Sequence, residues 1–120
     1  MTRSADDADF SASVSAESGV VVLRVRGAVD MVSRGDFEVA IDDALGAESV
    51  GVVVDLSEAG LFGSVGFAGL VKLHRAADGI VPVAVVAESL VTRRPLQVMG
   101  VEQLMPLYST LADAVHALTH

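Results

Sequence analysis

Two valine-rich runs limit the folds that this chain can adopt. Residues 50–56 read Val-Gly-Val-Val-Val-Asp-Leu, and residues 80–87 are similarly apolar. A strand that is apolar on both of its faces is typical of a sheet interior covered on each side. Residues 20–27 begin apolar and then alternate, with Arg24 and Arg26 on the expected wet face. We therefore expect a largely buried β-sheet with helices packed against it.

Four amphipathic segments separate or follow these strands and predict helices. In the first segment, apolar residues recur at helical spacing from Phe37 to Leu45. Ser33 has capping-box spacing to Asp36, and Gly46 stands where a left-handed residue would end the helix. The expected N-cap residues of the four helices are, in chain order, Ser33, Ser64, Thr92 and Thr110.

A hairpin and a short last strand complete the pattern. Residues 10–16 alternate weakly and can pair with residues 20–27 through a turn at positions 17–19, and residues 104–108 form the last expected strand. The order ββαβαβαβα predicts a single α/β domain over residues 10–120, with a four- or five-stranded mixed sheet and about four helices mainly on one face. Residues 1–9 are small, polar and acidic, and we expect a mobile tail there.

Composition narrows the range of functions. Sixteen acidic residues and eight basic ones give the 120-residue chain a formal charge of −8. Such a polyanion repels phosphate backbones and anionic lipids, so we expect no direct nucleic-acid binding and no membrane-surface binding. No apolar run approaches the ~20 residues of a membrane helix, so no membrane insertion is expected. Without an apolar secretion signal at its start, the chain is expected in the cytoplasm.

Catalytic and metal-binding patterns are not evident in the sequence. The stretch around Ser64 has Phe62 where a nucleophile elbow needs its first glycine. His74 lies ten residues from Ser64, which is about 15 Å along one helix. His116 and His120 have i, i+4 spacing but no third ligand, and cysteine is absent. We therefore expect no catalytic residue, no metal site and no cofactor.

Ser64 is the position with the most distinctive chemistry. It follows a glycine at a point where a buried strand has given way to a helix. As an N-cap its hydroxyl would accept an amide hydrogen bond worth ~1 kcal/mol, and this structural role alone would explain it. The functional alternative is phosphorylation, which would set about −1.5 to −2 charges against the N–H groups of Val65, Gly66 and Phe67. Such a switch would alter binding without unfolding the domain.

From about Phe10 to Leu118 the chain resembles the STAS-domain anti-sigma factor antagonists of bacteria, also called anti-anti-sigma factors. Residues 27–30 match a G-E-L-D-like motif at its glycine and its aspartate, and residues 55–57 match D-L-S. The hallmark turn D-S-[ST]-G-[LF] corresponds to residues 63–67, which maps the phosphorylated serine onto Ser64. The chain departs from the pattern with Gly63 in place of the acid and Val65 in place of the second hydroxyl.

The resemblance implies a partner-switching module of transcription regulation, as in stress responses. The unphosphorylated protein would bind an anti-sigma factor that is also a serine kinase, and so release a sigma factor. The kinase would phosphorylate Ser64 and a PP2C-type phosphatase would reverse the modification, so this chain would not be an enzyme. A weak homodimer stays open. The implied docking surface consists of Asp30, Met31, Ser33, Gly63, Ser64, Val65, Gly66, Phe67, Thr92 and Arg93.

Two other functions stay open beside this one. A STAS module can serve as the cytosolic subunit of a membrane transporter for lipids or anions, and the glycine at position 63 is compatible with that role. The glycine-rich turn could instead sense a nucleotide or another small ligand. A pull-down separates the first two functions, because it recovers either a kinase with its sigma factor or an ATPase with its permease. A thermal-shift screen detects the third, since ligand at ~100 times Kd adds about 2.7 kcal/mol of stability.

Overall fold

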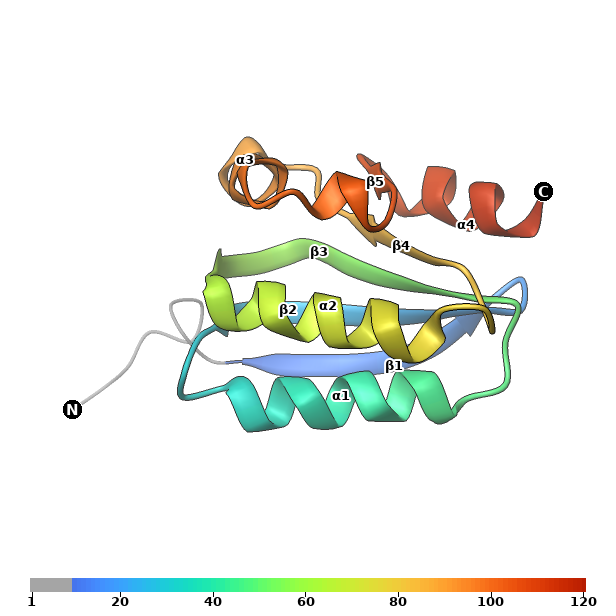
Figure 1. Ribbon diagram of the computed structural model, residues 1–120, viewed down its shortest axis with the longest axis horizontal. Coiled ribbons are helices and arrows are strands. Elements are labelled where there is room, and N and C mark those ends of the chain that lie inside the picture. The colour runs from blue at the N-terminus through green and yellow to red at the C-terminus, as the bar shows by residue number, and fades with distance from the viewer. Residues whose placement is uncertain (1–9) are drawn as a thin grey trace.

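The computed structural model describes residues 10–120, so the tail predicted for residues 1–9 lies outside the described part of the chain. Strands and helices alternate along most of the chain, as the sequence pattern predicts (Figure 1). The elements are β1 (Ser11–Glu17), β2 (Val20–Val29), α1 (Arg34–Gly46), β3 (Gly51–Phe62), α2 (Ser64–Ala77), β4 (Val83–Val86), α3 (Leu90–Val98), the 3-10 helix η1 (Val101–Gln103), β5 (Leu107–Tyr108) and α4 (Leu111–Thr119).

The strands form one mixed sheet in the order β1-β2-β3-β4-β5. β1 is antiparallel to β2, and every other neighbouring pair is parallel. The predicted hairpin turn is confirmed: Ser18 and Gly19 both have positive φ, at 54° and 83°. Two such residues in a two-residue loop match the right-handed twist of the strands they join. The mixed five-stranded sheet is therefore the one expected from the sequence.

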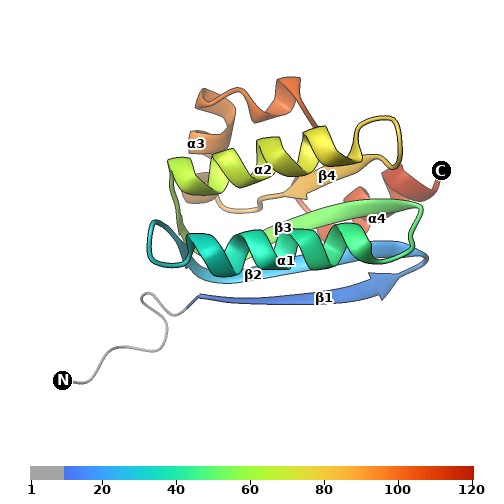
Figure 2. The same ribbon diagram turned by 60° about the horizontal axis from the view of Figure 1, so that its bottom comes forward.

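Three helices cover one face of the sheet and one helix covers the other (Figure 2). Buried residues of α1, α2 and α3, among them Ile41, Leu70 and Leu96, belong to the larger core cluster. Ala114 and Val115 of α4 pack in a second cluster with strand residues from the opposite face. β3 is buried on both sides along its first half, which explains the valine-rich run there. The expectation of helices mainly on one face is confirmed.

The composition of residues 57–60 predicts a turn after the buried strand, and this prediction is wrong. The sequence Ser-Glu-Ala-Gly at positions 57–60 has turn composition, but β3 continues through it to Phe62. This added length of β3 pairs with the end of β2, where Glu58 of β3 lies opposite Arg26 of β2. The two side chains form an ion pair with a distance of 2.7 Å between Arg26 Nε and Glu58 Oε1. Gly27, with φ of 79°, lies where the register between the two strands shifts. Cross-strand pairing thus outweighs the local turn preference.

Of the four residues predicted to cap a helix N-terminus, one accepts a capping hydrogen bond in its side chain. Thr110 caps α4 by accepting a hydrogen bond from the Asp113 amide at 3.1 Å. Ser33 is the N-cap residue of α1, as predicted, but its side chain makes no capping hydrogen bond. The cap of α3 is Ser89, which accepts from the Val91 amide at 3.1 Å, and not Thr92. At α2 the N-cap residue is Gly63 and not Ser64.

Two further predictions, for the end of the first helix and the length of the last strand, differ from the structure by a few residues. The first helix includes Gly46 and ends at an extended Ala47, so Gly46 is not the left-handed terminator expected. The last strand is shorter than expected and covers only Leu107 and Tyr108. Both differences are local and leave the order of elements unchanged.

α2 packs against the core through two glycines. The Phe37 and Phe62 rings meet edge to face at a centroid distance of 5.9 Å. A Cβ atom on Gly66 would lie 2.6 Å from the Phe62 ring, and one on Gly69 would lie 2.5 Å from the Phe37 ring. No real side chain fits at such distances without movement of the ring. The closeness of α2 to α1 and β3 therefore depends on glycine at these two positions.

We predict that Gly69→Ala lowers the free energy of unfolding by about 1–3 kcal/mol, because overpacking displaces the Phe37 ring. The matched control is Gly35→Ala in α1, where a Cβ atom meets nothing within 4 Å. That change should raise the free energy of unfolding by about 0.5 kcal/mol, since alanine favours a helix. Urea denaturation of both variants measures the difference. Equal stabilisation by the two substitutions would mean that the α1–α2 contact is not tight.

Candidate functional site

The predicted site residues lie at the carboxyl edge of the parallel strands. Parallel strands end on the same side of a sheet, so the segments that follow them gather there. β2 leads into residues 30–33, β3 into residues 63–64, and β4 into the start of α3. In Figure 1 the loop before α1, the start of α2 and α3 all lie at one end of the molecule. The fold therefore brings together three segments that are far apart in the sequence.

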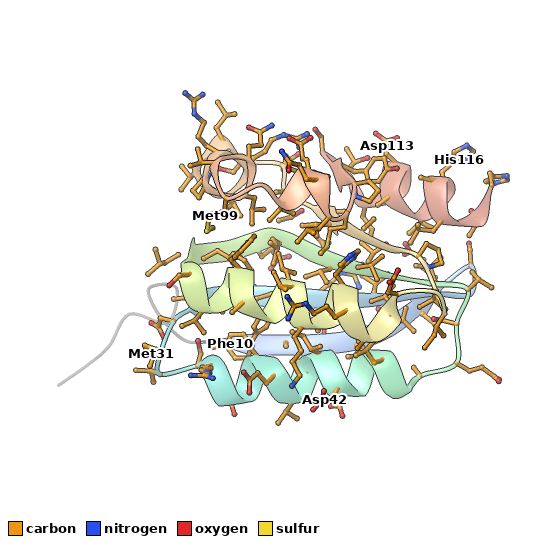
Figure 3. All side chains as sticks on the ribbon, viewed as in Figure 1. Phe10, Met31, Asp42, Met99, Asp113 and His116 are labelled. Carbon is orange, nitrogen blue, oxygen red and sulfur yellow. The ribbon has the colours of Figure 1, made fainter. Side chains whose placement is uncertain are left out.

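The loop between β2 and α1 is closed by its own polar side chains. Asp30 Oδ1 accepts hydrogen bonds from the amides of Val32 at 3.0 Å and Ser33 at 3.1 Å. The buried Ser33 hydroxyl donates to the Ala28 carbonyl at 2.8 Å and accepts from the Asp30 amide at 3.0 Å. Asp30 and Ser33 thus shape the loop from within. Met31, which Figure 3 labels, is 71% exposed to solvent. Its neighbour Val32 is 94% exposed.

The turn between β3 and α2 is tied to the same loop. The Gly63 amide donates to the Val29 carbonyl at the end of β2, at 3.3 Å. Gly63 is the N-cap of α2, with φ of −89° and ψ of −166°, and Ser64 is the first helical residue. The predicted N-cap role of Ser64 is therefore wrong, because the helix starts one residue earlier than capping by Ser64 requires. The side chain of Ser64 is exposed and available for another role.

The first turn of α2 leaves fewer free amides than the sequence suggests. Gly66 and Phe67 donate to the Gly63 carbonyl at 2.9 and 3.2 Å, so both amides are already engaged. Within residues 10–120, the amides of Ser64 and Val65 are the two of this turn without a carbonyl acceptor. A phosphate on Ser64 would therefore meet two free N–H groups, not the three predicted. The positive end of the helix dipole still favours an anion there.

Gly63 does not need to be glycine for the backbone to adopt this turn. Its φ is in the range open to any residue, and the nearest atom to an added Cβ would be the Val29 oxygen at 3.9 Å. The acidic residue of the family motif would therefore fit at this position. With glycine at this position the turn keeps its backbone geometry, but position 63 supplies no carboxylate beside the Ser64 hydroxyl.

The two residues predicted in α3 have structural roles. Thr92 is buried, with 4% exposure, which contradicts the expectation of an exposed position. Arg93 donates from Nη1 to the Ala87 carbonyl at 2.9 Å and to the Ser109 hydroxyl at 3.2 Å, and so links α3 to the ends of β4 and β5. The side chains that α3 presents to solvent at its start are Leu90 and Val91.

Exposed apolar side chains at this edge were missed by the sequence analysis. Val32, Leu61, Leu90 and Val91 are each more than 60% exposed. The signal that could have revealed them is an apolar residue in a turn or at a helix start, outside the buried stripe of its element. Exposed apolar residues gathered at one edge of a domain are a frequent mark of a protein-binding surface. We call Met31, Val32, Leu61, Leu90 and Val91 the apolar rim.

Among residues 10–120, no group of three histidine, cysteine or acidic side chains is arranged to hold a metal ion. His116 and His120 stack with centroids 4.2 Å apart at the end of α4. No helix in residues 10–120 is both long enough and apolar enough to cross a membrane. The arrangement is suited to binding a partner across the apolar rim.

The chain is similar to a family model, to a curated protein and to a solved structure. Residues 11–114 match the family model described as STAS domain. The chain is 35% identical to the anti-sigma-F factor antagonist RsfB of Mycobacterium tuberculosis over 106 residues, which is 88% of this chain and 87% of that protein. The crystal structure of an anti-sigma factor antagonist from Mycobacterium paratuberculosis matches with a TM-score of 0.90 and 32% identity, over 99% of this chain and 100% of that one.

A more distant structure shares the fold. The Bacillus cell fate determinant SpoIIAA, solved in its phosphorylated form, has a TM-score of 0.65 and 16% identity. The match covers 92% of this chain and 99% of that one. At this identity the likeness concerns the fold alone.

We predict that two serine substitutions at this site differ in their effect on folding. Ser33→Ala leaves the Ala28 carbonyl and the Asp30 amide without their partner, and should lower the free energy of unfolding by about 1–3 kcal/mol. Ser64→Ala removes an exposed hydroxyl that caps nothing, and should change the same quantity by less than about 0.5 kcal/mol. Urea denaturation tests both. A loss for Ser64→Ala as large as that for Ser33→Ala would contradict the hydrogen bonding described above.

Proposed function

The chain belongs to the STAS-domain family, and from this premise we propose that it is an anti-sigma factor antagonist, which binds an anti-sigma factor and thereby frees a sigma factor. RsfB and the Mycobacterium paratuberculosis protein bear that description, and both match this chain over most of their length. The observation that carries the proposal is the position of Ser64, exposed at the start of α2 and at the same edge as the apolar rim.

The partner in this proposal is an anti-sigma factor with serine kinase activity, in the cytoplasm. The kinase transfers the γ-phosphoryl group of ATP to the Ser64 oxygen, which releases ADP and the hydroxyl proton. A PP2C-type phosphatase restores the free serine. Three features support Ser64 as the acceptor: it matches the family motif, its side chain is exposed, and Val65 offers no competing hydroxyl. In this scheme the chain is a ligand and a substrate, not an enzyme.

Binding of the unphosphorylated protein is driven by burial of the apolar rim. Each large aliphatic side chain that becomes fully buried contributes about 1.5–3 kcal/mol before the costs of association. The loop bearing Met31 and Val32 is already closed by Asp30 and Ser33, so little ordering is needed on binding. A preformed surface of this kind binds without the entropic cost of folding a loop.

Phosphorylation affects the free and bound forms differently. In the free protein, the phosphate faces solvent, the positive end of α2 and the amides of Ser64 and Val65. In a complex, the same group of −1.5 to −2 charges would be trapped against a packed surface and would lose its hydration. The modification therefore penalises the complex while leaving the folded domain intact. Phosphorylated SpoIIAA, which shares this fold, is consistent with a domain that tolerates the modification.

We predict that Ser64→Ala abolishes phosphorylation by the cognate kinase but retains binding to the anti-sigma factor within a few-fold. Ser64→Glu should weaken binding only in part, because a carboxylate carries less charge than phosphate and lacks its geometry. Phosphate mapping by mass spectrometry and titration calorimetry provide the two measurements. Stoichiometric phosphorylation of the Ser64→Ala protein would show that the switch lies elsewhere. A wild-type protein that no cognate kinase modifies would favour a constitutive binder or a transporter subunit.

A second prediction concerns the glycine that replaces the family acid. Gly63→Asp places a preferred N-cap residue at the positive end of α2 and should raise the free energy of unfolding by about 0.5 kcal/mol. If the acid orients the Ser64 hydroxyl, the same change should speed phosphorylation in a single-turnover assay. Gly35→Asp is the matched control, because it adds the same charge to open space at the start of α1. An unchanged rate in the stabilised Gly63→Asp protein would assign the acid a structural role only.

A further inference from the structure

The outer edge of β1 is open among the described residues. Within residues 10–120, β1 is the last strand of the sheet on its side, and its one paired neighbour is β2. In a two-residue hairpin the residues next to the turn, here Glu17 and Val20, form a hydrogen-bonded pair, and such pairs alternate along the strands. The N–H and C=O groups of the intervening residues Ala12, Val14 and Ala16 therefore point away from β2. They form a row of backbone donors and acceptors that another strand can pair with.

The same three residues place their side chains on the face that α1 covers. Residues directly opposite each other in an antiparallel pair share a face. Ala12, Val14 and Ala16 lie opposite β2 residues that all belong to the core cluster containing α1, namely Val25, Leu23 and Val21. A strand added beside β1 would thus direct alternate side chains along the flank of α1.

β1 lacks the devices that usually protect an edge strand. Such edges commonly carry lysine, proline, a bulge or an inward-pointing charge. The sequence of β1 is Ser-Ala-Ser-Val-Ser-Ala-Glu, with small side chains and one charge at its end. Its register with β2 has no shift over seven pairs, so no bulge turns the edge aside. The edge is regular and accessible to a partner along its described length.

A groove of about 330 Å³ lies between α1 and the beginning of β1, where Phe10, Ser11 and Ala12 line it. Its α1 wall carries Asp36, Val39 and Asp43, which share one side of the helix at i, i+3 and i+7. Val39 is 58% exposed between the two acids. Within residues 10–120, the ion pairs of α1 use its other acids, Glu38 and Asp42. Along α1 the groove therefore presents a carboxylate (Asp36), an apolar side chain (Val39) and a second carboxylate (Asp43).

We propose that β1 binds an extended segment of a partner protein as an added strand, with a basic-x-apolar-x-basic sequence. Asp36 and Asp43 are separated by about 10.5 Å along the helix axis. Basic residues at i and i+4 of a strand are about 13.6 Å apart, a difference that flexible lysine or arginine side chains cover. The apolar residue at i+2 then lies against Val39. Backbone pairing provides the affinity and the two charges select the sequence.

A second copy of this chain is a poorer occupant for the same edge. An isologous pairing of two β1 strands leaves both α1 helices on the same face of the joined sheet. Asp36 and Asp43 of one copy would then face the same acids of the other, in a protein whose net charge is already −8. Like charges placed together in this way oppose association. The charge of the groove thus favours a basic partner segment.

The experiment uses the full chain labelled with ¹⁵N and a capped peptide, Ser-Thr-Lys-Thr-Val-Thr-Lys-Thr-Ser. Peptide binding should slow solvent exchange of the Ala12, Val14 and Ala16 amides and leave the Ser13 and Ser15 amides, which face β2, unchanged. A control peptide with both lysines replaced by glutamate should not bind. The expected pattern is the same in the Ser64→Glu protein, so the result is independent of the proposed phosphorylation switch.

Two variants test the two components of the proposal. Val14→Pro removes one outward N–H and leaves the pairs with β2 in place, and should weaken peptide binding about tenfold or more. Asp36→Asn with Asp43→Asn should weaken it about three- to tenfold, whereas Glu102→Gln with Asp113→Asn, an equal change of net charge elsewhere, should have little effect.

Three results would overturn the proposal. The first is uniform protection of inward and outward amides, and the second is equal weakening by the two double variants. The third is protection of the outward amides in the protein alone together with a dimeric mass in solution, which would assign the edge to a second copy.

Discussion

The placement of α2 depends on contact between its two glycines and two aromatic rings. Phe62 ends β3 and Phe37 belongs to α1, and their edge-to-face contact fills the space beneath Gly66 and Gly69. Because no Cβ intervenes, the helix lies close to the sheet and begins directly after β3. The start of α2, and with it Ser64, is therefore fixed by packing rather than by a side-chain cap. A serine that is free of capping can carry a modification without loss of a structural hydrogen bond.

The carboxyl edge of the sheet combines rigid support with exposed apolar side chains. Asp30 and Ser33 close the loop after β2, the Gly63 amide ties the next turn to β2, and Arg93 links α3 to the ends of two strands. These polar groups are hydrogen-bonded within the chain, so they shape the edge from their own side. What the edge offers outward is the apolar rim and the Ser64 hydroxyl.

Hydrophobic patterning predicted the sheet, the helices and their order, because strands apolar on both faces and helices apolar on one are both visible in sequence. It failed where a tertiary contact overrides a local preference. Residues 57–60 have turn composition but extend β3 because β2 offers a matching edge. Ser33 resembles a helix cap, but its hydroxyl is held by the Ala28 carbonyl five residues earlier. Thr92, in α3, was expected at the surface and is buried. The apolar rim depends on side-chain exposure, which spacing alone does not specify.

The central claim is that phosphate on Ser64 disrupts partner binding and leaves the fold unchanged. The most direct measurement compares the purified unphosphorylated and singly phosphorylated chains by calorimetric titration with the cognate anti-sigma factor, with thermal unfolding of both forms recorded alongside. The account predicts an affinity at least about tenfold weaker for the phosphorylated chain, which corresponds to about 1.4 kcal/mol, with closely similar unfolding temperatures. Equal affinities for the two forms, or a phosphorylated chain that is unfolded, would contradict it.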